Sequence, residues 1–126
     1  MPVTVGLGAA SPDEKIRATV RAVGREVDLT LFSCPGTAGS FGDTVRVVEA
    51  VHPEAALVEA LAAGDIDAAV RGTLPASSTL AALKAAAGVD HLERIALLET
   101  AEGHLFLLAP VGVDEGWTVA DKVRFV

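Results

Sequence analysis

DIDAAVRGTLPASST, residues Asp65–Thr79, is the stretch of sequence that decides the fold. It opens with an apolar run from Ile66 to Val70 between glycine turn signals, and such a run is typical of a buried strand in a parallel sheet. A polar glycine loop follows. A hydroxyl-rich start at Ala76–Thr79 then leads into LAALKAAAG, a helix that Gly88 ends. The order strand, loop, helix is the repeating unit of α/β proteins.

The loop and helix start after this strand form the candidate site. Backbone N–H groups at a helix N-terminus attract anions, and a nearby arginine can bind phosphate or carboxylate through two parallel hydrogen bonds. Open α/β sheets place ligands at the carboxyl ends of their strands. In the alternative interpretation, Ser77 or Ser78 simply caps the helix and Arg71 is solvated. The predicted anion-binding residues are Arg71, Gly72, Thr73, Ser77 and Ser78.

Composition limits the class of protein. The chain has 126 residues, 51% of them hydrophobic, which is enough for one α/β domain, 1–126, with a core of small aliphatic side chains. Its net charge of -7 would repel a phosphate backbone, so we expect no nucleic-acid partner. A local cationic pocket remains compatible with this charge, so an anionic small molecule is the expected ligand.

Location follows from what the sequence lacks. No run approaches the roughly 18 apolar residues of a membrane helix, so no membrane association is expected. The start, MPVTVGLG, has no basic segment followed by an apolar one, as a secretory signal would have. The single cysteine, Cys34, fits a reducing compartment. We therefore predict a cytoplasmic protein.

The remaining elements follow from periodicity and turn signals. Ser11, Pro12 and Glu14 predict a capped helix start, and Gly64 and Gly88 are expected helix ends. Buried helical stripes are expected at Ile16, Val20 and Val23, and at Leu80, Leu83 and Ala87. We predict strands at 3–8, 28–33, 45–48, 66–70, 94–99 and 104–109, the last two as an antiparallel hairpin, and helices opening at Ser11, Pro53, about Ser78 and Thr118.

This order predicts a three-layer α/β/α sandwich with a mostly parallel sheet and an antiparallel hairpin. The stripe of the last helix, Val119, Val123 and Val126, reaches the last residue without a stop signal. We therefore expect the protein to continue in nature, with this chain as the N-terminal part of the full fold. A short natural terminus is the alternative.

Other candidate chemistry is weaker. Residues 6–11, GLGAAS, approach a dinucleotide fingerprint, but Glu26 and Asp28 are misplaced for binding a ribose. Cys34 opens a glycine-rich loop that ends at Asp43. It could be a nucleophile if an imidazole or a helix dipole lowered its pKa, and an incidental thiol is the alternative. The three histidines, His52, His91 and His104, show no metal-ligand spacing, so no metal is expected.

A resemblance adds to these expectations. The segment Asp65–Val126 resembles the middle of the phosphate acetyl/butyryltransferase superfamily, and GLGAASPDEKIRATVRAV, residues 6–23, is similar to its first strand and helix start. Within the superfamily, RGTLPAS (71–77) and APVGVDEGWTV (109–119) look most like methanogenesis marker protein 4, the methyltransferase-related MtxX family of archaeal proteins.

The resemblance implies a fold like that of isocitrate and isopropylmalate dehydrogenases, a cytoplasmic archaeal setting and a homodimer. In the acyltransferases, acyl phosphate and coenzyme A bind in a cleft between two subdomains. This chain departs from them in carrying Arg71, where they usually have a small residue, and in a loop about one residue shorter. No S-adenosylmethionine motif accompanies the resemblance.

Two functional hypotheses follow. The first is a transferase, associated with methanogenesis, that binds a phosphorylated or acyl-phosphate small molecule, with catalytic residues that the sequence does not identify and coenzyme A implied only by the resemblance. The second is a non-catalytic binding or scaffold protein that keeps the acyltransferase fold.

Overall fold

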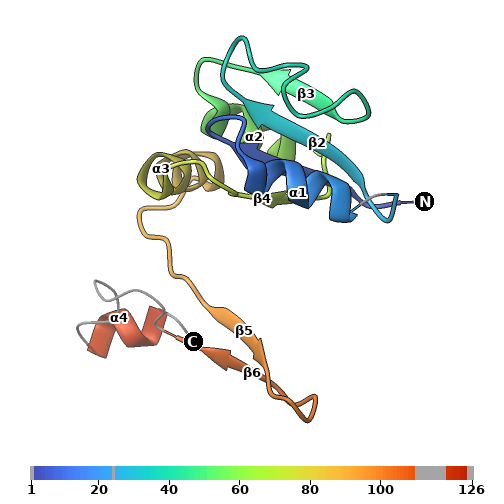
Figure 1. Cartoon of the computed structure of the whole chain (residues 1–126). Coiled ribbons are helices and arrows are strands. Elements are labelled where there is room, and N and C mark those ends of the chain that lie inside the picture. The colour runs from blue at the N-terminus through green and yellow to red at the C-terminus, as the bar shows by residue number, and fades with distance from the viewer. Residues whose placement is uncertain (1, 24, 110–118, 125–126) are drawn as a thin grey trace. The chain divides into compact units, whose positions relative to one another are not determined.

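The computed structural model describes residues 2–23, 25–109 and 119–124. The chain forms two compact units, residues 1–88 and 89–126 (Figure 1). The prediction that 1–126 is a single domain stays a prediction. The elements of the first unit are β1 (Thr4–Ala9), α1 (Glu14–Val23), β2 (Asp28–Ser33), β3 (Arg46–Glu49), α2 (Pro53–Ala63), β4 (Ala68–Val70) and α3 (Ala76–Ala87). Those of the second are β5 (Ala96–Glu99), β6 (Leu105–Leu108) and α4 (Val119–Arg124).

The four strands of the first unit form one parallel sheet in the order β3-β2-β1-β4. β1 and β2 are paired over their whole lengths, from Thr4 opposite Asp28 to Ala9 opposite Ser33. β4 pairs with the other side of β1, so β1 has a neighbour on each side. A parallel sheet was predicted, and it is confirmed.

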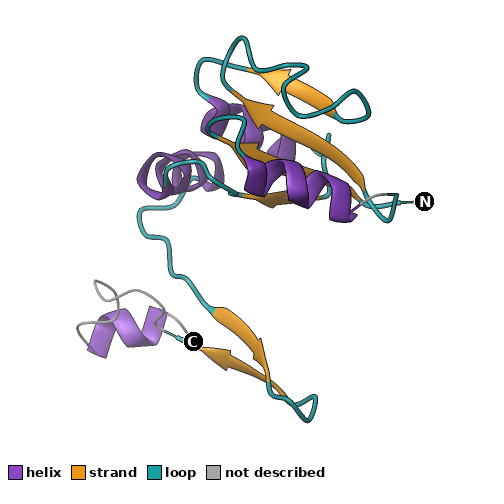
Figure 2. Ribbon diagram, in the orientation of Figure 1, coloured by secondary structure: helices purple, strands orange, loops and turns teal. Residues whose placement is uncertain are grey.

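Helices cover both faces of this sheet (Figure 2). On one face, Ile16 of α1 packs with Leu7 and Leu31, which alternate along β1 and β2 with the side chains of the opposite face. On the other face, Leu57 of α2 packs with Phe32 and with further buried side chains. The second cluster comprises Phe32, Leu57, Ile66 and Leu74, joined by the partly buried Ala56, Ala60 and Leu61.

The connection from β2 to β3 contains no helix. Parallel neighbours need a crossover, and here the glycine-rich loop that begins at Cys34 provides it. Phe41 in this loop is only 3% exposed and joins the core cluster on the α1 face. One aromatic side chain thus anchors a segment that would otherwise have no core of its own.

The helix ends were predicted well, but the start of α1 was not. Gly64 and Gly88 end α2 and α3 in the left-handed conformation, which confirms both predicted stops. The predicted capping box of Ser11 with Glu14 is wrong, because Asp13 precedes the helix and its Oδ1 accepts a hydrogen bond from the backbone N–H of Ile16. Both residues can cap, and only the path of the loop selects between them.

The prediction of a buried strand at 66–70 is partly wrong. Ile66 is buried, but it precedes β4 and packs under α2 instead of pairing with β1. The strand itself is exposed along its length, with Val70 49% exposed, because β4 is the edge of the four-stranded sheet. The stripe expected on α3 is also partly wrong, since Leu80 and Leu83 are half-buried but Ala87 is exposed and Thr79 is the buried residue.

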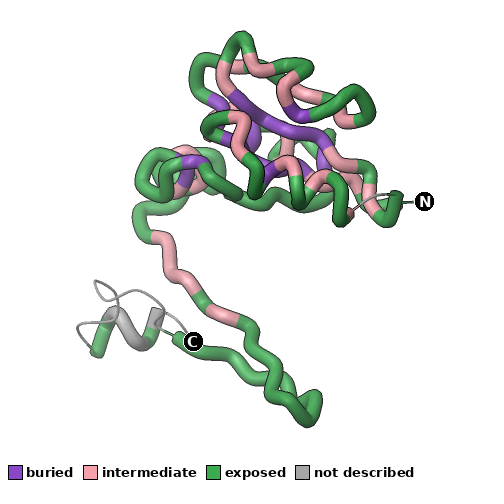
Figure 3. The backbone as a smooth tube through the Cα atoms, viewed as in Figure 1, coloured by how far each residue is buried: buried purple, intermediate pink, exposed green. Residues whose placement is uncertain are grey.

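The second unit contains the predicted antiparallel hairpin, β5 paired with β6. Leu98 lies opposite Phe106 on one face, and Leu97 lies opposite Leu107 on the other, so both faces are apolar. Leu97 is 66% exposed and Leu107 is 68% exposed (Figure 3). In α4, Val119 and Val123 are exposed as well, whereas Thr118 and Val126 of the predicted helix lie outside the described residues.

The architecture confirms the coarse fold class. It is an α/β protein with a parallel sheet between helices and a separate antiparallel hairpin. The specific likeness to isocitrate and isopropylmalate dehydrogenases stays a prediction. Across the described ranges, no helix combines the length and the apolarity needed to span a bilayer.

Candidate functional site

The predicted anion-binding loop lies at a topological switch point of the sheet. β1 and β4 are neighbours, and the chain leaves β1 toward α1, which packs on one face. After β4 the chain turns toward the opposite face, because Leu74 in the loop before α3 packs in the cluster on that face. Open α/β sheets form their ligand crevices where neighbouring strands diverge in this way.

Two hydrogen bonds join the loops that follow β1 and β4. The backbone N–H of Ala10 donates to Thr73 Oγ1 at 2.9 Å, and the backbone N–H of Thr73 donates to the carbonyl oxygen of Gly8 at 3.2 Å. The Thr73 hydroxyl therefore accepts from β1's loop and still has its own proton to donate. The structure thus fixes the position of this predicted site residue.

Gly72 makes the close approach of the two loops possible. Its φ is +61°, and a Cβ placed there would lie 2.0 Å from the carbonyl oxygen of Gly8. Gly8 is equally constrained, because a Cβ there would lie 2.4 Å from the carbonyl oxygen of Arg71. Gly72 therefore has no room for a side chain, because the backbone of β1 lies directly against it.

Arg71 is exposed and is anchored within its own loop. Its Nη1 donates to the carbonyl oxygen of Leu74 at 2.6 Å, and Leu74 is only 1% exposed. Among the contacts between described residues, this is the one hydrogen bond of the guanidinium, so most of its N–H groups face solvent. An arginine held in this way can present its remaining donors to a phosphate or a carboxylate.

The two serines differ in their surroundings. Pro75 occupies the N-cap of α3 without a side-chain hydrogen bond, so the alternative that Ser77 or Ser78 caps the helix is wrong. Ser78 Oγ donates to Glu54 Oε1 at 2.9 Å, which places a carboxylate beside this helix start. Ser77 is exposed in the first turn. The structure brings Arg71, Gly72 and Thr73 together with the end of β1, and it places Ser77 and Ser78 in the first turn of α3.

The other predicted candidates lie in several parts of the chain, and Cys34 directly follows the carboxyl end of β2, where Ser33 lies opposite Ala9. Asp28 stands at the amino end of β2, opposite Thr4, whereas a ribose-binding carboxylate would lie at the carboxyl end. His52, His91 and His104 are exposed, and Cys34 is a half-buried free thiol. Within the residues that the structure describes, no three His, Cys, Asp or Glu side chains gather as metal ligands would.

Glu49 holds the glycine-rich loop, and no local sequence pattern indicates this contact. Glu49 Oε1 accepts from the backbone N–H of Ala38 at 2.8 Å, and Oε2 accepts from that of Gly36 at 3.1 Å. The backbone hydrogen bond from Ala38 contributes most, and that from Gly36 contributes next, to holding the pKa of the Glu49 carboxyl below its usual value. A carboxylate of β3 thus holds the start of the glycine-rich loop through two backbone N–H groups.

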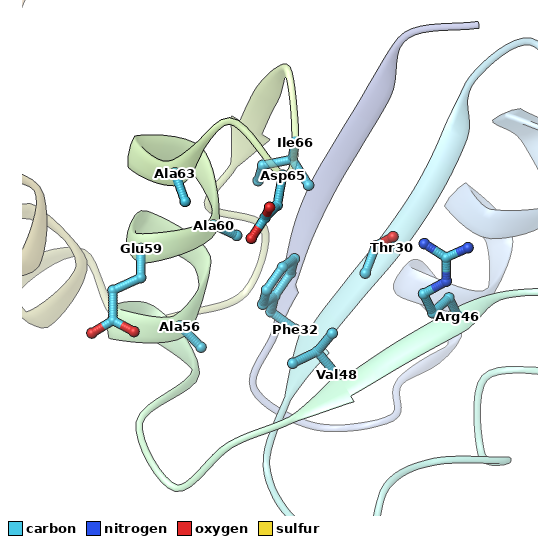
Figure 4. A pocket seen from close by; sticks show the side chains of 10 residues that line it. All are labelled: Thr30, Phe32, Arg46, Val48, Ala56, Glu59, Ala60, Ala63, Asp65 and Ile66. Atoms are coloured by element: carbon cyan, nitrogen blue, oxygen red, sulfur yellow. The ribbon is translucent and has the colours of Figure 1, made fainter.

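A groove that sequence reasoning missed lies between α2 and the strands β2 and β3 (Figure 4). Its volume is about 500 Å³, with Phe32 on its floor and Arg46 on the strand side. The charged side chains Glu59 and Asp65 come from the opposite side. The sequence signal is the run of small residues on one face of α2. Its lining residues are Thr30, Phe32, Arg46, Val48, Ala56, Glu59, Ala60, Ala63, Asp65 and Ile66.

Comparison with known proteins gives partial relatives. The chain is 46% identical over 85 residues to the "Putative methyltransferase mtx subunit X" of Methanosarcina mazei and 49% identical over 85 residues to the protein of that name from Methanosarcina acetivorans. It is 45% identical over 80 residues to an "Uncharacterized methyltransferase" of Methanopyrus kandleri. No family model matches the chain. No solved structure matches it either.

The coverage of these matches is unequal. The matched stretch is 68% of this chain but only 30% of each of the two Methanosarcina proteins. For the Methanopyrus protein the shares are 64% and 31%. The match therefore spans under a third of the relatives' length. Over about two thirds of its own length, the chain is homologous to proteins of methanogens that are named as methyltransferases.

Proposed function

We propose that this chain is part of a group-transfer enzyme that binds an anionic small molecule, a phosphorylated or acyl-phosphate compound, at the carboxyl edge of β1 and β4. The observation that carries the proposal is the junction of the two loops at the switch point, where Thr73 accepts from Ala10 and donates its backbone N–H to Gly8. The names of the relatives supply the class of reaction, transfer of a group, and not the group itself.

In this proposal the five predicted residues have different roles. Arg71 neutralises the anion with the donors that its bond to Leu74 leaves available. Ser77 and the uncapped N–H groups of the first turn of α3 donate to the same anion. Gly72 and Thr73 set the shape of the loop. Ser78 contributes least, because its hydroxyl donates to Glu54.

Calorimetry with acetyl phosphate and with inorganic phosphate tests this proposal. We expect Arg71→Ala to weaken binding about tenfold or more, equivalent to about 1.4 kcal/mol. Lys84→Ala is the matched control, because Lys84 is an exposed cation in the last turn of the same helix, α3. Equal dissociation constants for Arg71→Ala and the original chain would overturn the proposed site.

Glu54→Gln gives a second arm of the same experiment. The carboxylate accepts from Ser78 at the start of α3, where it opposes an incoming anion. Replacing it with a neutral amide should therefore tighten phosphate binding, whereas Glu59→Gln on the exposed side of α2 should not. A weaker or unchanged affinity in Glu54→Gln would show that the anion does not sit at this helix start.

The second candidate is the non-catalytic scaffold. The apolar surface of the hairpin favours it, because Leu105 and Leu107 are 67% and 68% exposed on one face. If the chain binds neither phosphate nor acetyl phosphate in calorimetry, the transferase hypothesis has no binding site to rest on. The scaffold hypothesis then gains support. Saturable binding that depends on Arg71 supports the anion site on which the transferase proposal rests, and release of phosphate from acetyl phosphate would separate an enzyme from a binding protein.

A further inference from the structure

Arginines line one side of α1 and the turn that follows it. Arg17 and Arg21 are four residues apart, and Arg25 follows at the same interval beyond the end of the helix. Four residues advance a helix by about 6 Å and return the side chain to nearly the same face. All three line a single groove of about 600 Å³ on this side of the first unit.

The opposite wall of this groove is the glycine-rich loop between β2 and β3. Ser40, Phe41 and Thr44 line it there. The Nε of Arg17 donates to the carbonyl oxygen of Ser40 at 2.9 Å, and Phe41 is buried in the core beneath. Both walls are therefore fixed to each other by contacts that need no ligand.

The charges in the groove do not cancel. Glu14 forms an ion pair with Arg21 and lies 3.9 Å from Arg17, so one carboxylate serves two guanidinium groups. Arg25 is exposed, and the contacts between described residues include none for its guanidinium. The groove therefore keeps an excess of positive charge in a chain whose net charge is -7.

The cationic surface continues into a neighbouring cavity of about 400 Å³. Val20, Arg25 and Thr44 line both cavities, which makes them contiguous. The second cavity adds Arg46 from β3 and the carboxylate of Asp28. Three of the ten lysines and arginines in the chain, Arg17, Arg21 and Arg25, thus line this depression, whereas the Arg46 side chain lies in the groove on the α2 face.

We propose that the groove between α1 and the glycine-rich loop binds a small molecule that carries two or more phosphate groups. Its volume lies in the range of small-molecule pockets, about 300–1,000 Å³. Arginine forks bind phosphate oxygens in pairs, and the helical rise of about 6 Å between Arg17 and Arg21 suits a ligand with several anionic groups. None of these residues belongs to the loops after β1 and β4, so this is a second site, independent of the proposed function.

Calorimetry with inorganic triphosphate as the probe tests this proposal on the whole chain. Arg25→Ala should weaken binding about tenfold or more, and Arg25→Lys should recover part of the affinity because the charge remains without the fork. Lys84→Ala should leave the triphosphate affinity within about twofold, because Lys84 is an exposed cation that lines neither site. An equal loss in Arg25→Ala and Lys84→Ala would reduce the binding to unspecific charge attraction and overturn the proposal.

Nuclear magnetic resonance gives a readout that does not depend on any variant. Addition of triphosphate should shift the amide signals of Ser40, Phe41 and Thr44, which line the proposed groove. Shifts confined to the loop after β4 would assign the binding to the switch-point site instead. Inorganic phosphate should bind more weakly than triphosphate, and equal affinities would contradict a site for several phosphate groups.

Discussion

The hydroxyl oxygen of Thr73 accepts a hydrogen bond from the backbone N–H of Ala10 at 2.9 Å, and this bond joins the loops that follow β1 and β4. Replacement by the isosteric valine removes the acceptor and leaves the Ala10 N–H without its partner. We expect Thr73→Val to lower the free energy of unfolding by about 1 kcal/mol. Urea denaturation measures this loss, and Thr73→Ser, which keeps the hydroxyl, should stay near the original value. A Thr73→Val variant as stable as the original chain would contradict a stabilising role of this hydrogen bond.

Gly72 should tolerate no side chain. Alanine at its φ of +61° incurs the cost of the left-handed conformation, about 1–2 kcal/mol, and its Cβ would also meet the Gly8 carbonyl at 2.0 Å. Gly36→Ala is the matched control, since its φ is +86° but a Cβ there has nothing within 4 Å. In thermal or urea unfolding, Gly72→Ala should be destabilised by about 1–3 kcal/mol more than Gly36→Ala. A smaller loss in Gly72→Ala than in Gly36→Ala would contradict this close packing.

Glu49 should make the stability of the first unit depend on pH in the acid range. The backbone N–H groups of Ala38 and Gly36 lower the pKa of the folded carboxyl below its ordinary value of 4.5. The folded state therefore binds this proton less readily than the unfolded state does. The stabilisation is complete above the unfolded pKa and is lost as the pH falls through the lowered folded pKa.

Urea midpoints measured from neutral to acid pH test this dependence. Glu49→Gln should show a shallower loss on acidification than the original chain, because the titrating group is gone. Glu59→Gln removes another exposed carboxylate of the same unit and should keep the original slope. If Glu49→Gln and the original chain lose stability in parallel, the loop does not depend on this carboxylate.

The hairpin should bind hydrophobic dye. Leu105 and Leu107 leave most of their surface in solvent on one face of β6, and two paired strands alone provide no core. We expect strong fluorescence from anilinonaphthalene sulfonate with the chain, and a clear decrease with the double variant Leu105→Thr and Leu107→Thr. Val3→Thr, a change at a residue 50% exposed in the first unit, should leave the signal unchanged. A decrease of equal size in the control would place the dye elsewhere.

The sequence predicted those features that depend on a few neighbouring residues. β2 is predicted at 28–33 and observed at Asp28–Ser33. Its apolar residues Leu29 and Leu31 follow the two-residue repeat of a strand, and polar residues stand at both ends. Gly64 and Gly88 were recognised as helix ends because left-handed backbone favours glycine. The antiparallel hairpin likewise follows from two apolar runs around a short glycine turn.

Features that depend on tertiary placement could not be predicted in the same way. Ile66 belongs to an apolar run, and only the position of β4 at the sheet edge decides that it packs under α2 instead of joining the strand. The predicted site also depends on tertiary placement. The hydroxyl residues after Arg71 suggested equivalent donors, but the Ser78 hydroxyl already donates to Glu54 of another helix, α2. The partnership of Glu49 with the glycine-rich loop joins residues more than ten positions apart, and no local pattern signals it.

The central position of β1 has a consequence for how the first unit opens to solvent. β1 is paired on both sides, so its amides can exchange with deuterium only when at least one neighbouring strand separates from it. The three residues of β4 have a partner on one side only, and fraying there would precede exposure of Thr4–Ala9. The slowest amides of the chain are therefore expected in β1 and in the facing half of β2, so that the strand which supplies Gly8 to the candidate site is also the last to open.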